Sequence, residues 1–184
     1  MSNKLLKLEN PERVNELSPE TTLRRIGLRA DDVFCDIGAG SGLFVLPAAK
    51  MTSGDVYALE IDEDMLTLIR ERADAQGLYH LHTVAVRDGN FGLPPGTADI
   101  VLLATVLHEI EDQRSFLADI YSLLKAGGRL AVIEFRAGHT PFGPSPERRM
   151  SRERIEEIVC AAGFAYSDFF TLGPNFIAFA FSKH

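Results

Sequence analysis

The hydrophobic residues of this chain gather in short runs separated by stretches rich in Gly, Pro and charged residues. Runs with the length and composition of buried strands cover residues 33–37, 56–60, 81–86 and 97–104. The stretches that predict helices cover residues 43–51, 62–76 and 113–124, and in the last of them apolar residues recur at helical spacing. The run 97–104 is almost continuously apolar, as is typical of a parallel strand buried by helices on both faces. The pattern therefore predicts an α/β fold.

Both ends of the chain carry further predicted elements. Residues 11–17 and 19–26 each begin with proline after a capping residue type, Asn10 and Ser18, which predicts two short helices. We expect this segment either to cover one face of the sheet or to lie over a ligand. At the other end, residues 169–172 and 176–181 flank a Gly-Pro-Asn turn and predict a hairpin. Its last strand is apolar on both faces, so we expect it inside the sheet.

Three alternate glycines, Gly38, Gly40 and Gly42, stand between the first predicted strand and a predicted helix. Glycine there permits positive φ and close approach of a ligand, and N–H groups at the helix start offer donors. The dinucleotide pattern G-x-G-x-x-G would place its third glycine at position 43, which is Leu43. Glu60 ends the second strand, about twenty residues on, where an acid can bind ribose hydroxyls. Glu60 thus indicates a ribose without choosing between nucleotide cofactors.

Composition and charge narrow the class of protein. The length of 184 residues suits one domain, and we expect a helical segment over 1–30 followed by that domain over 31–184. A net charge of −7 argues against broad nucleic-acid binding. No apolar stretch is long enough to span a bilayer and no basic-then-apolar leader opens the chain, so we expect a cytoplasmic protein without a membrane partner. Cys35 and Cys160 occupy apolar positions without metal-ligand spacing, so we expect buried free thiols and no metal site.

An ordered set of features carries a family resemblance over about residues 30–182. The set comprises the Asp-x-Gly-x-Gly-x-Gly pattern from Asp36 to Gly42, then Glu60, Asp88, the strand at Asp99, the paired glycines Gly127 and Gly128, and the terminal hairpin. We expect the paired glycines to end the helix before them and to reverse the chain into the fifth strand. This resembles the class I S-adenosylmethionine-dependent methyltransferases, near the type 11 and ubiquinone/menaquinone enzymes. The resemblance implies a Rossmann-like, doubly wound sheet of seven strands in the order 3-2-1-4-5-7-6, with strand 7 antiparallel and helices in layers on both sides.

The resemblance also implies S-adenosyl-L-methionine as the cofactor. The residues that it places against the cofactor are Asp36, Gly38, Ala39, Gly40, Gly42, Glu60, Ile61, Asp88 and Gly89. In this scheme Asp36 and the glycine backbone hold the methionine part, Glu60 the ribose and Asp88 the adenine. An Asp-Gly pair that only forms a turn would look similar, so that alternative stays open for Asp88.

The residues after the fourth and fifth strands are candidates for the methyl acceptor. His108 and Glu109 follow the fourth strand, and either could serve as the base that a hydroxyl or enol acceptor requires. Glu134 ends the fifth strand and Arg148 follows the Gly/Pro-rich loop 137–146, which we expect to act as a lid; both residues are substrate candidates. The alternatives are a packing role for His108, an ordinary strand-end acid at Glu134 and a solvated mixed-charge face around Arg148.

The acceptor that we expect is a small organic molecule. The Asn/Asp-Pro-Pro-Tyr/Phe signature of nucleic-acid amino methylation is absent after the fourth strand, where residues 104–107 read Ala-Thr-Val-Leu. We expect no nucleic-acid partner and a monomer or homodimer. Two other function classes remain: a non-catalytic module that binds S-adenosylmethionine or its demethylated product, and a nicotinamide-dependent oxidoreductase.

Overall fold

The computed structural model describes residues 3–138 and 140–184. The chain divides into two compact units, Met1–Leu93 and Pro94–His184, which are described separately below. The predicted division into a helical segment and one domain at residue 30 stays a prediction. The helices before residue 30 belong to the same unit as the glycine turn.

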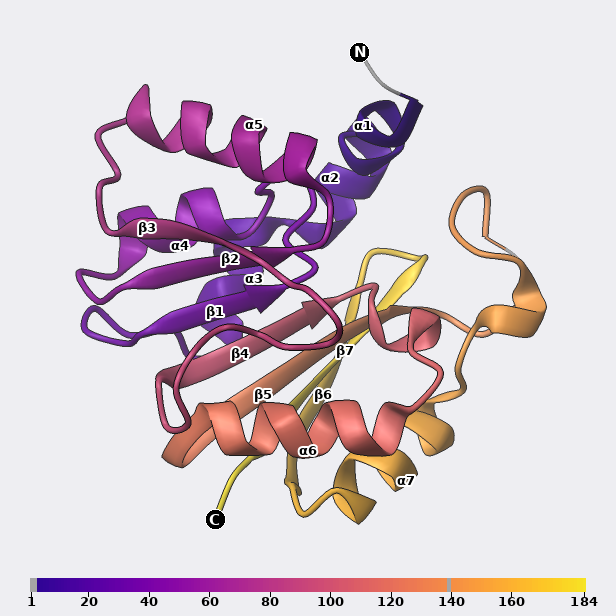
Figure 1. Ribbon diagram of the computed structural model, residues 1–184. Coiled ribbons are helices and arrows are strands. Elements are labelled where there is room, and N and C mark those ends of the chain that lie inside the picture. The colour runs from indigo at the N-terminus through magenta and orange to yellow at the C-terminus, as the bar shows by residue number, and fades with distance from the viewer. Residues whose placement is uncertain (1–2, 139) are drawn as a thin grey trace. The chain divides into compact units, whose positions relative to one another are not determined.

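The first unit contains a parallel, three-stranded part of the sheet with five helices among its described residues. Its elements are α1 (Asn3–Leu8), α2 (Pro11–Leu17), α3 (Pro19–Arg25), β1 (Phe34–Ile37), α4 (Val45–Met51), β2 (Val56–Glu60), α5 (Glu63–Asp74) and β3 (Leu81–Ala85). β2 lies between β1 and β3, and α5 packs along β2 and β3 (Figure 1). All four residues of β1 are buried, which explains why three of them are apolar; the fourth is Asp36.

Helix α5 shows how local sequence positions this unit. The side chain of Asp62 caps its start by accepting hydrogen bonds from the N–H groups of Asp64 and Met65. The buried positions of the helix, Met65, Leu66, Ile69 and Ala73, repeat every three or four residues and form one apolar face. The capped start lies directly after Glu60, so the end of β2 is held between a strand and a helix.

The second unit contains parallel and antiparallel strands. Its elements are β4 (Ala98–Ala104), the 3₁₀ turn η1 (Leu107–Glu109), α6 (Gln113–Leu123), β5 (Leu124–Phe135), the 3₁₀ turn η2 (Pro146–Arg148), α7 (Arg152–Ala161), β6 (Ala165–Leu172) and β7 (Phe176–Ser182). β4 pairs with β5 in parallel, and β7 pairs antiparallel with both β5 and β6. Helices α6 and α7 lie side by side, α6 against β5 and α7 against β6 (Figure 1).

The sheet has seven strands in the order β3-β2-β1-β4-β5-β7-β6, and helices flank it. This order, with an antiparallel last strand inside the sheet, confirms the predicted fold class. The apolar character of both faces of β7 follows from its place between β5 and β6, because five of its seven residues are buried.

Three local predictions were wrong. The paired glycines Gly127 and Gly128 do not end α6, which stops at Leu123; they lie within β5, where the register with β4 shifts. The side chain of Ser18 does not cap α3 but donates to the carbonyl of Asn15. Cys160 is exposed, because it lies on the outer face of α7, whereas Cys35 is buried as expected.

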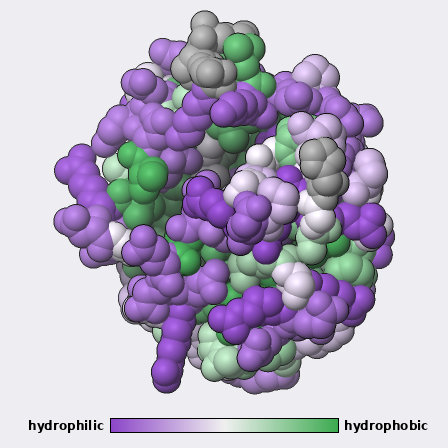
Figure 2. Space-filling model, turned by 90° about the vertical axis from the view of Figure 1, so that its right-hand side faces the viewer, coloured by the Kyte–Doolittle hydropathy of each residue, from purple (hydrophilic) through white to green (hydrophobic). Residues whose placement is uncertain are grey.

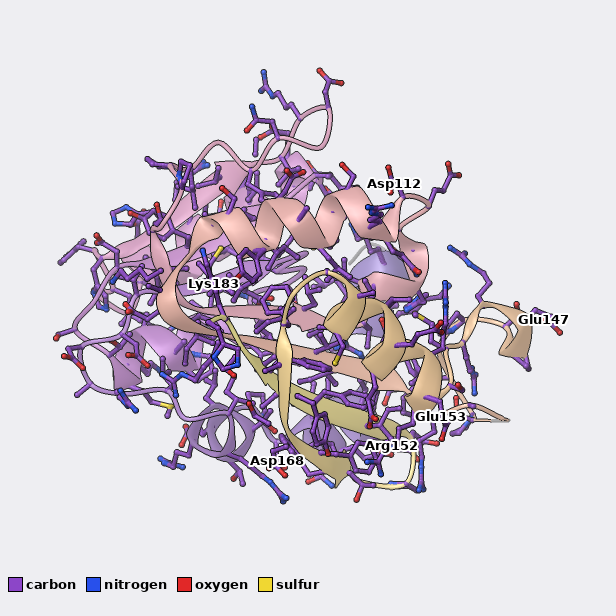
Figure 3. The ribbon with its side chains drawn as sticks, turned by 90° about the horizontal axis from the view of Figure 1, so that it is seen from below. Asp112, Glu147, Arg152, Glu153, Asp168 and Lys183 are labelled. Atoms are coloured by element: carbon purple, nitrogen blue, oxygen red, sulfur yellow. The ribbon has the colours of Figure 1, made fainter. Side chains whose placement is uncertain are left out.

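Helix α6 is held at both ends by residues distant in the sequence. Asp112 caps its start by accepting from the N–H of Ser115. Lys183 donates to the carbonyl groups of Tyr121 and Leu124 near its end, at 2.6 Å each. Figure 3 shows Asp112 and Lys183 toward opposite ends of the helix. The C-terminal segment after β7 therefore fixes the end of α6 that local sequence leaves open.

The surface is mostly polar. On the face drawn in Figure 2, hydrophilic residues cover most of the area and hydrophobic residues show in smaller regions. The exposed large hydrophobic residues among those described are Leu6, Ile61, Tyr79 and Tyr166. In the described ranges, none of the helices has the length and hydropathy that a membrane crossing requires.

Candidate functional site

The glycine turn after β1 is closed by hydrogen bonds within the protein. The N–H groups of Gly38 and Ala39 both donate to the carbonyl of Leu59, and that of Gly42 donates to Ala39. The three glycines all have positive φ, as the spacing predicts. The N–H groups of Gly38, Ala39 and Gly42 are therefore engaged inside the protein, and α4 begins only at Val45. The turn contributes shape more than the free N–H donors that we expected.

At two of these positions, close packing by neighbouring side chains leaves little room for a Cβ. A Cβ at Gly42 would lie 3.1 Å from Ile69 Cγ1 and 3.2 Å from Leu46 Cδ1, so Gly42 lets α5 and α4 approach the turn. A Cβ at Gly40 would lie 3.3 Å from Leu8 Cδ1 on α1. The space beside Gly40 is thus occupied by a protein side chain. A Gly40→Val substitution would disturb this contact as well as any ligand, so it does not isolate ligand approach.

Helix α1, which the sequence pattern did not predict, lies on the glycine turn. Leu8 covers Gly40, and Lys4 Nζ lies 2.7 Å from Asp62 Oδ2 and 3.9 Å from Glu60 Oε1. Glu9, just after the helix, pairs with Arg72 of α5, and Arg72 Nη1 donates to the carbonyl of Ser41 at 3.0 Å. Helix α1 therefore covers the glycine turn, and the role predicted for the helices at 11–17 and 19–26 stays a prediction.

Asp36, at the end of β1, is a buried carboxyl group with an unsatisfied oxygen. The residue is 1% exposed, and among the described residues Oδ1 has no hydrogen-bond partner. The pKa of Asp36 is raised to about 8, chiefly by burial and also by the charge of Glu60, while the charge of Arg13 opposes the shift. A buried polar atom of this kind is costly unless a partner is supplied. Asp36 is therefore suited to receive a cationic or hydrogen-bond-donating group of a ligand.

Arg13 is a residue of this site that sequence reasoning missed. It lies on α2, is buried, and donates from Nη1 to the carbonyl of Leu8 at 2.8 Å. Burial lowers the pKa of Arg13 to about 10, and the nearby Asp36 carboxylate opposes this change. One feature of the sequence could have indicated it: Arg13 lies four residues before Leu17 and so shares its buried helix face, where charged side chains are rare unless they are paired. The N-terminal helices thus bring a compensating charge to Asp36.

Glu60 joins the glycine turn to the start of α5. Its carboxylate is 6% exposed; Oε2 accepts from the N–H of Gly40 at 2.8 Å, and Oε1 from those of Ile61 at 3.0 Å and Asp62 at 3.2 Å. A carboxylate offers about four lone-pair sites, so roughly one is left for a ligand donor. Glu60 therefore has a structural role that the sequence did not reveal, and room for a ribose hydroxyl besides.

The remaining cofactor candidates differ in environment. Ile61 follows Glu60 and is 76% exposed, so it offers an apolar surface beside a buried carboxylate. Asp88 and Gly89 have φ of 51° and 74° and form the tip of a turn in which Asn90 N–H donates to the Arg87 carbonyl at 2.9 Å. Asp88 is exposed. The Asp-Gly pair thus makes the turn that we considered as an alternative, and its contact with a ligand stays a prediction.

In the second unit, His108 and Glu134 form a buried pair. Glu134 is the second-last residue of β5 and His108 lies in η1, and their side chains are 1% and 4% exposed. Glu134 Oε2 lies 2.7 Å from His108 Nδ1, and Oε1 accepts from the His108 backbone N–H at 3.2 Å. Thr105, between β4 and η1, has φ of 61°, an uncommon conformation that turns the chain toward this pair. The structure thus brings together two candidates that the sequence placed apart.

The environment of this pair is aromatic on one side, and on the other side it carries the exposed carboxylate of Glu109. The His108 ring meets Phe135 edge to face at a centroid distance of 6.2 Å, and Phe135 contacts Phe142 and Phe176. His108 Nε2 lies 3.9 Å from Oε1 of Glu109, whose side chain is 63% exposed. The Nδ1 edge is therefore held inside the protein, and the Nε2 edge faces a solvent-accessible carboxylate.

The arginines near the Gly/Pro-rich loop have different partners. Arg149 donates to the carbonyl groups of Gly138 and Pro144, so it holds the loop together. Arg152 and Arg154 pair with Glu156 and Glu157 on their own helix, as the mixed-charge alternative predicts. The Arg152 guanidinium also lies over the Phe169 ring at 3.9 Å. These three side chains are engaged within the protein.

Arg148 has fewer interactions with the rest of the protein than the three arginines above. Arg148 is exposed and forms no side-chain ion pair with another described residue. Figure 3 shows Glu147, its neighbour in η2, on an outer turn away from the strands. A substrate role for Arg148 and a lid role for the loop stay predictions.

No group of three or more His, Cys, Asp or Glu side chains suited to a metal ion occurs in the part of the chain that the structure describes. Each unit thus holds one cluster of candidate residues: Asp36 with Glu60 and Arg13 in the first, and His108 with Glu134 in the second. The strand order, the glycine turn after β1 and the acid at the end of β2 define a Rossmann-like domain of the cofactor-binding class.

Comparisons with known proteins identify the family. A family model described as a methyltransferase domain matches residues 35–130, about half of the chain. A ubiquinone/menaquinone biosynthesis C-methyltransferase of Marinomonas is 29% identical over 125 residues, which are 66% of this chain and 50% of that protein. A demethylmenaquinone methyltransferase of Tropheryma whipplei is 30% identical over 112 residues, or 61% and 45% of the two chains. The chain spans about half the length of the curated relatives it matches. It belongs to the methyltransferase domain family.

Solved structures agree with this assignment. A SAM-dependent methyltransferase from Aquifex aeolicus is 26% identical, with a TM-score of 0.92 over 98% of this chain and 97% of that one. The [4+2]-cyclase SpnF has a TM-score of 0.78 at 17% identity, over 91% and 81% of the two chains. The likeness to the cyclase shows the fold alone. The same fold thus occurs in a protein described by a different reaction, so function has to be argued from the site.

Proposed function

We propose that this protein transfers a methyl group from S-adenosyl-L-methionine to a small organic acceptor. The observation that carries the proposal is the buried carboxyl group of Asp36, whose Oδ1 has no hydrogen-bond partner among residues 3–138 and 140–184. The α-ammonium group of the donor would supply both the missing hydrogen bond and a compensating charge. The Aquifex aeolicus protein, similar over nearly the whole chain and described as SAM-dependent, supports the choice of donor.

Other residues of the first unit fit the rest of the donor. Glu60 has about one lone-pair site left for a ribose hydroxyl. Ile61 offers exposed apolar surface next to it, which suits an adenine ring, and we retain Asp88 as a candidate for the adenine amino group. Gly38, Ala39, Gly40 and Gly42 shape the turn against which the methionine part would lie. The residues present therefore fit S-adenosylmethionine.

The donor's sulfonium supplies an already activated methyl group, so the protein needs no covalent intermediate. Its residues have to hold the two reactants in line and keep water out. For the acceptor we propose a small organic molecule, since curated relatives are named for ubiquinone, menaquinone and demethylmenaquinone methylation. We propose His108 and Glu109 as residues that act on it.

Isothermal calorimetry with S-adenosylhomocysteine and NADH tests the cofactor assignment. We expect binding of S-adenosylhomocysteine and none of NADH. Glu60→Gln should weaken that binding roughly tenfold or more, because a charge-assisted hydrogen bond is worth about 1.5–3 kcal/mol. The matched control is Glu63→Gln, an exposed residue of α5, which should bind as the wild type does. Binding of NADH alone would overturn the proposal.

A second measurement separates an enzyme from a binding module. The protein is incubated with donor carrying a labelled methyl group and a panel of small hydroxylated and amino acceptors. Transfer of label to any acceptor supports the enzyme. Tight binding of S-adenosylhomocysteine with no transfer to any member of a broad panel favours a non-catalytic module.

A further inference from the structure

The second unit holds a histidine whose two ring nitrogens are treated differently. His108 Nδ1 lies 2.7 Å from Glu134 Oε2, inside the protein, and its own backbone N–H donates to the other oxygen of the same carboxylate. A carboxylate only accepts hydrogen bonds, so Nδ1 has to carry the proton. In the neutral ring, Nε2 then keeps its lone pair. Two hydrogen bonds from one residue to one buried carboxylate fix both the position and the tautomer of the ring.

The surroundings favour the same assignment. Phe135 meets the ring edge to face and packs against Phe142 and Phe176, so one side of the imidazole is held by aromatic rings. A Cβ at Gly143 would lie 2.5 Å from the Phe135 ring, so the loop backbone packs closely against this ring. Around Nε2 the nearest charged group is Glu109, at 3.9 Å, on an exposed side chain. A buried ring held this firmly is costly to build as mere packing, because His and Glu are both polar.

From this geometry we infer that Glu134 is a positioning residue that prepares His108 Nε2 as a proton acceptor, and that the methyl acceptor is a compound activated by loss of a hydroxyl proton. The inference rests on the proposed function. An amine attacks with its own lone pair, so it needs no base when the new bond forms. A phenol or enol becomes a strong nucleophile only when its proton leaves.

The step balances as follows. His108 Nε2 takes the hydroxyl proton, and the electron pair left on the acceptor forms the bond to the methyl carbon. The carbon–sulfur bond of the donor breaks and its electron pair stays on sulfur, which becomes neutral. The proton on His108 then passes to water. One methyl cation has been exchanged for one proton, with no oxidant or reductant involved.

Glu134 was a substrate candidate from the sequence, and its burial redirects that role. Its side chain is 1% exposed, and both of its oxygens accept from His108. We therefore assign it an action through the histidine. The protonation of the two ring nitrogens of His108 therefore tests the assignment directly, since a purely structural Glu134 would not control which of them carries the proton.

The first experiment reads the tautomer in the intact protein by long-range ¹H–¹⁵N correlation, at a pH of about 8, where an ordinary imidazole is neutral. We expect the wild-type ring to be protonated at Nδ1. Glu134→Gln keeps the size of the side chain but can donate, so the population protonated at Nε2 should rise. Glu111→Gln, an exposed change of the same kind, should leave the spectrum unchanged. Protonation at Nε2 in the wild type, or no change in Glu134→Gln, would overturn the positioning role.

The second experiment measures methyl transfer to defined probes: catechol, naphthol and reduced naphthoquinone as hydroxyl probes, aniline and naphthylamine as amine probes. We expect label only on hydroxyl probes, and a fall in kcat of at least roughly 100-fold in His108→Gln and Glu134→Gln. The inference is refuted if label appears on amine probes alone or on no hydroxyl probe. It is also refuted if kcat is undiminished in both variants. Calorimetry with S-adenosylhomocysteine accompanies each variant. If the wild type does not bind S-adenosylhomocysteine, the result counts against the proposed function. If it binds but His108 is protonated at Nε2, or label appears only on amine probes, the result counts against this inference alone.

Discussion

Replacing Asp36 by Asn should change how the stability of the protein depends on pH. Burial raises the pKa of the Asp36 carboxyl from 3.8 to about 8 in the folded protein, chiefly because the charged form is deprived of water. Between these values the folded state keeps a proton that the unfolded chain has lost. The contribution of Asp36 is therefore fully present below a pH of about 4 and is lost as the pH rises toward 8. Stability falls with rising pH through this window.

The size of the effect follows from the two pKa values. A difference of one pKa unit corresponds to about 1.4 kcal/mol, so the free energy of unfolding should fall by about 3–4 kcal/mol between pH 5 and pH 8 on account of this group. A typical domain has only about 5–15 kcal/mol in total, so the change is readily measured. Asn carries no titrating group, and this part of the slope should vanish in Asp36→Asn.

The assay is urea unfolding followed by circular dichroism at several pH values in that range. Asp119→Asn, an exposed aspartate of α6, is the matched control and should keep the wild-type slope. Saturating S-adenosylhomocysteine should flatten the wild-type slope, because an ammonium group beside Asp36 favours its charged form. It should not alter the slope of Asp36→Asn. An Asp36→Asn slope equal to that of the wild type would refute the burial argument, and a slope indifferent to the ligand would refute the ammonium contact.

Two further substitutions test the framework around the sites. Gly54→Ala would place a Cβ 2.4 Å from the carbonyl oxygen of Asp32, and overpacking against backbone should lower the free energy of urea unfolding by about 1–3 kcal/mol; an unchanged midpoint would contradict the contact. Ser151→Ala removes the side chain that accepts from Arg154 N–H at the start of α7, and should cost about 1 kcal/mol in the same assay, while Ser151→Gly should cost only a few tenths. Equal losses in the two Ser151 variants would argue against capping.

Much of the fold could be predicted because it depends on local and periodic signals. The apolar runs place β1, β2 and β4 to within a residue at each end, and the double-sided apolar pattern of 176–181 predicts an interior strand. The strand order itself came from the resemblance, and the structure confirms it. The errors lie where tertiary pairing overrides a local signal. Gly127 and Gly128 look like a helix end, yet they lie inside β5, which pairs with β4 at Leu124 and again from Arg129, with a register shift between the two.

The site divides in the same way. The sequence by itself determined which residue types stand near the carboxyl ends of the strands, Asp36 in β1, Glu60 at the end of β2 and Glu134 in β5, because an apolar run that ends in an acid is visible in the chain. It did not determine what those acids touch. Only the tertiary structure set Glu60 on the N–H of Gly40, left Asp36 Oδ1 without a hydrogen bond to any described residue and placed Glu134 on His108. The physical reason is that hydrogen bonds and burial join residues from separate elements, whereas hydrophobic periodicity describes each element alone.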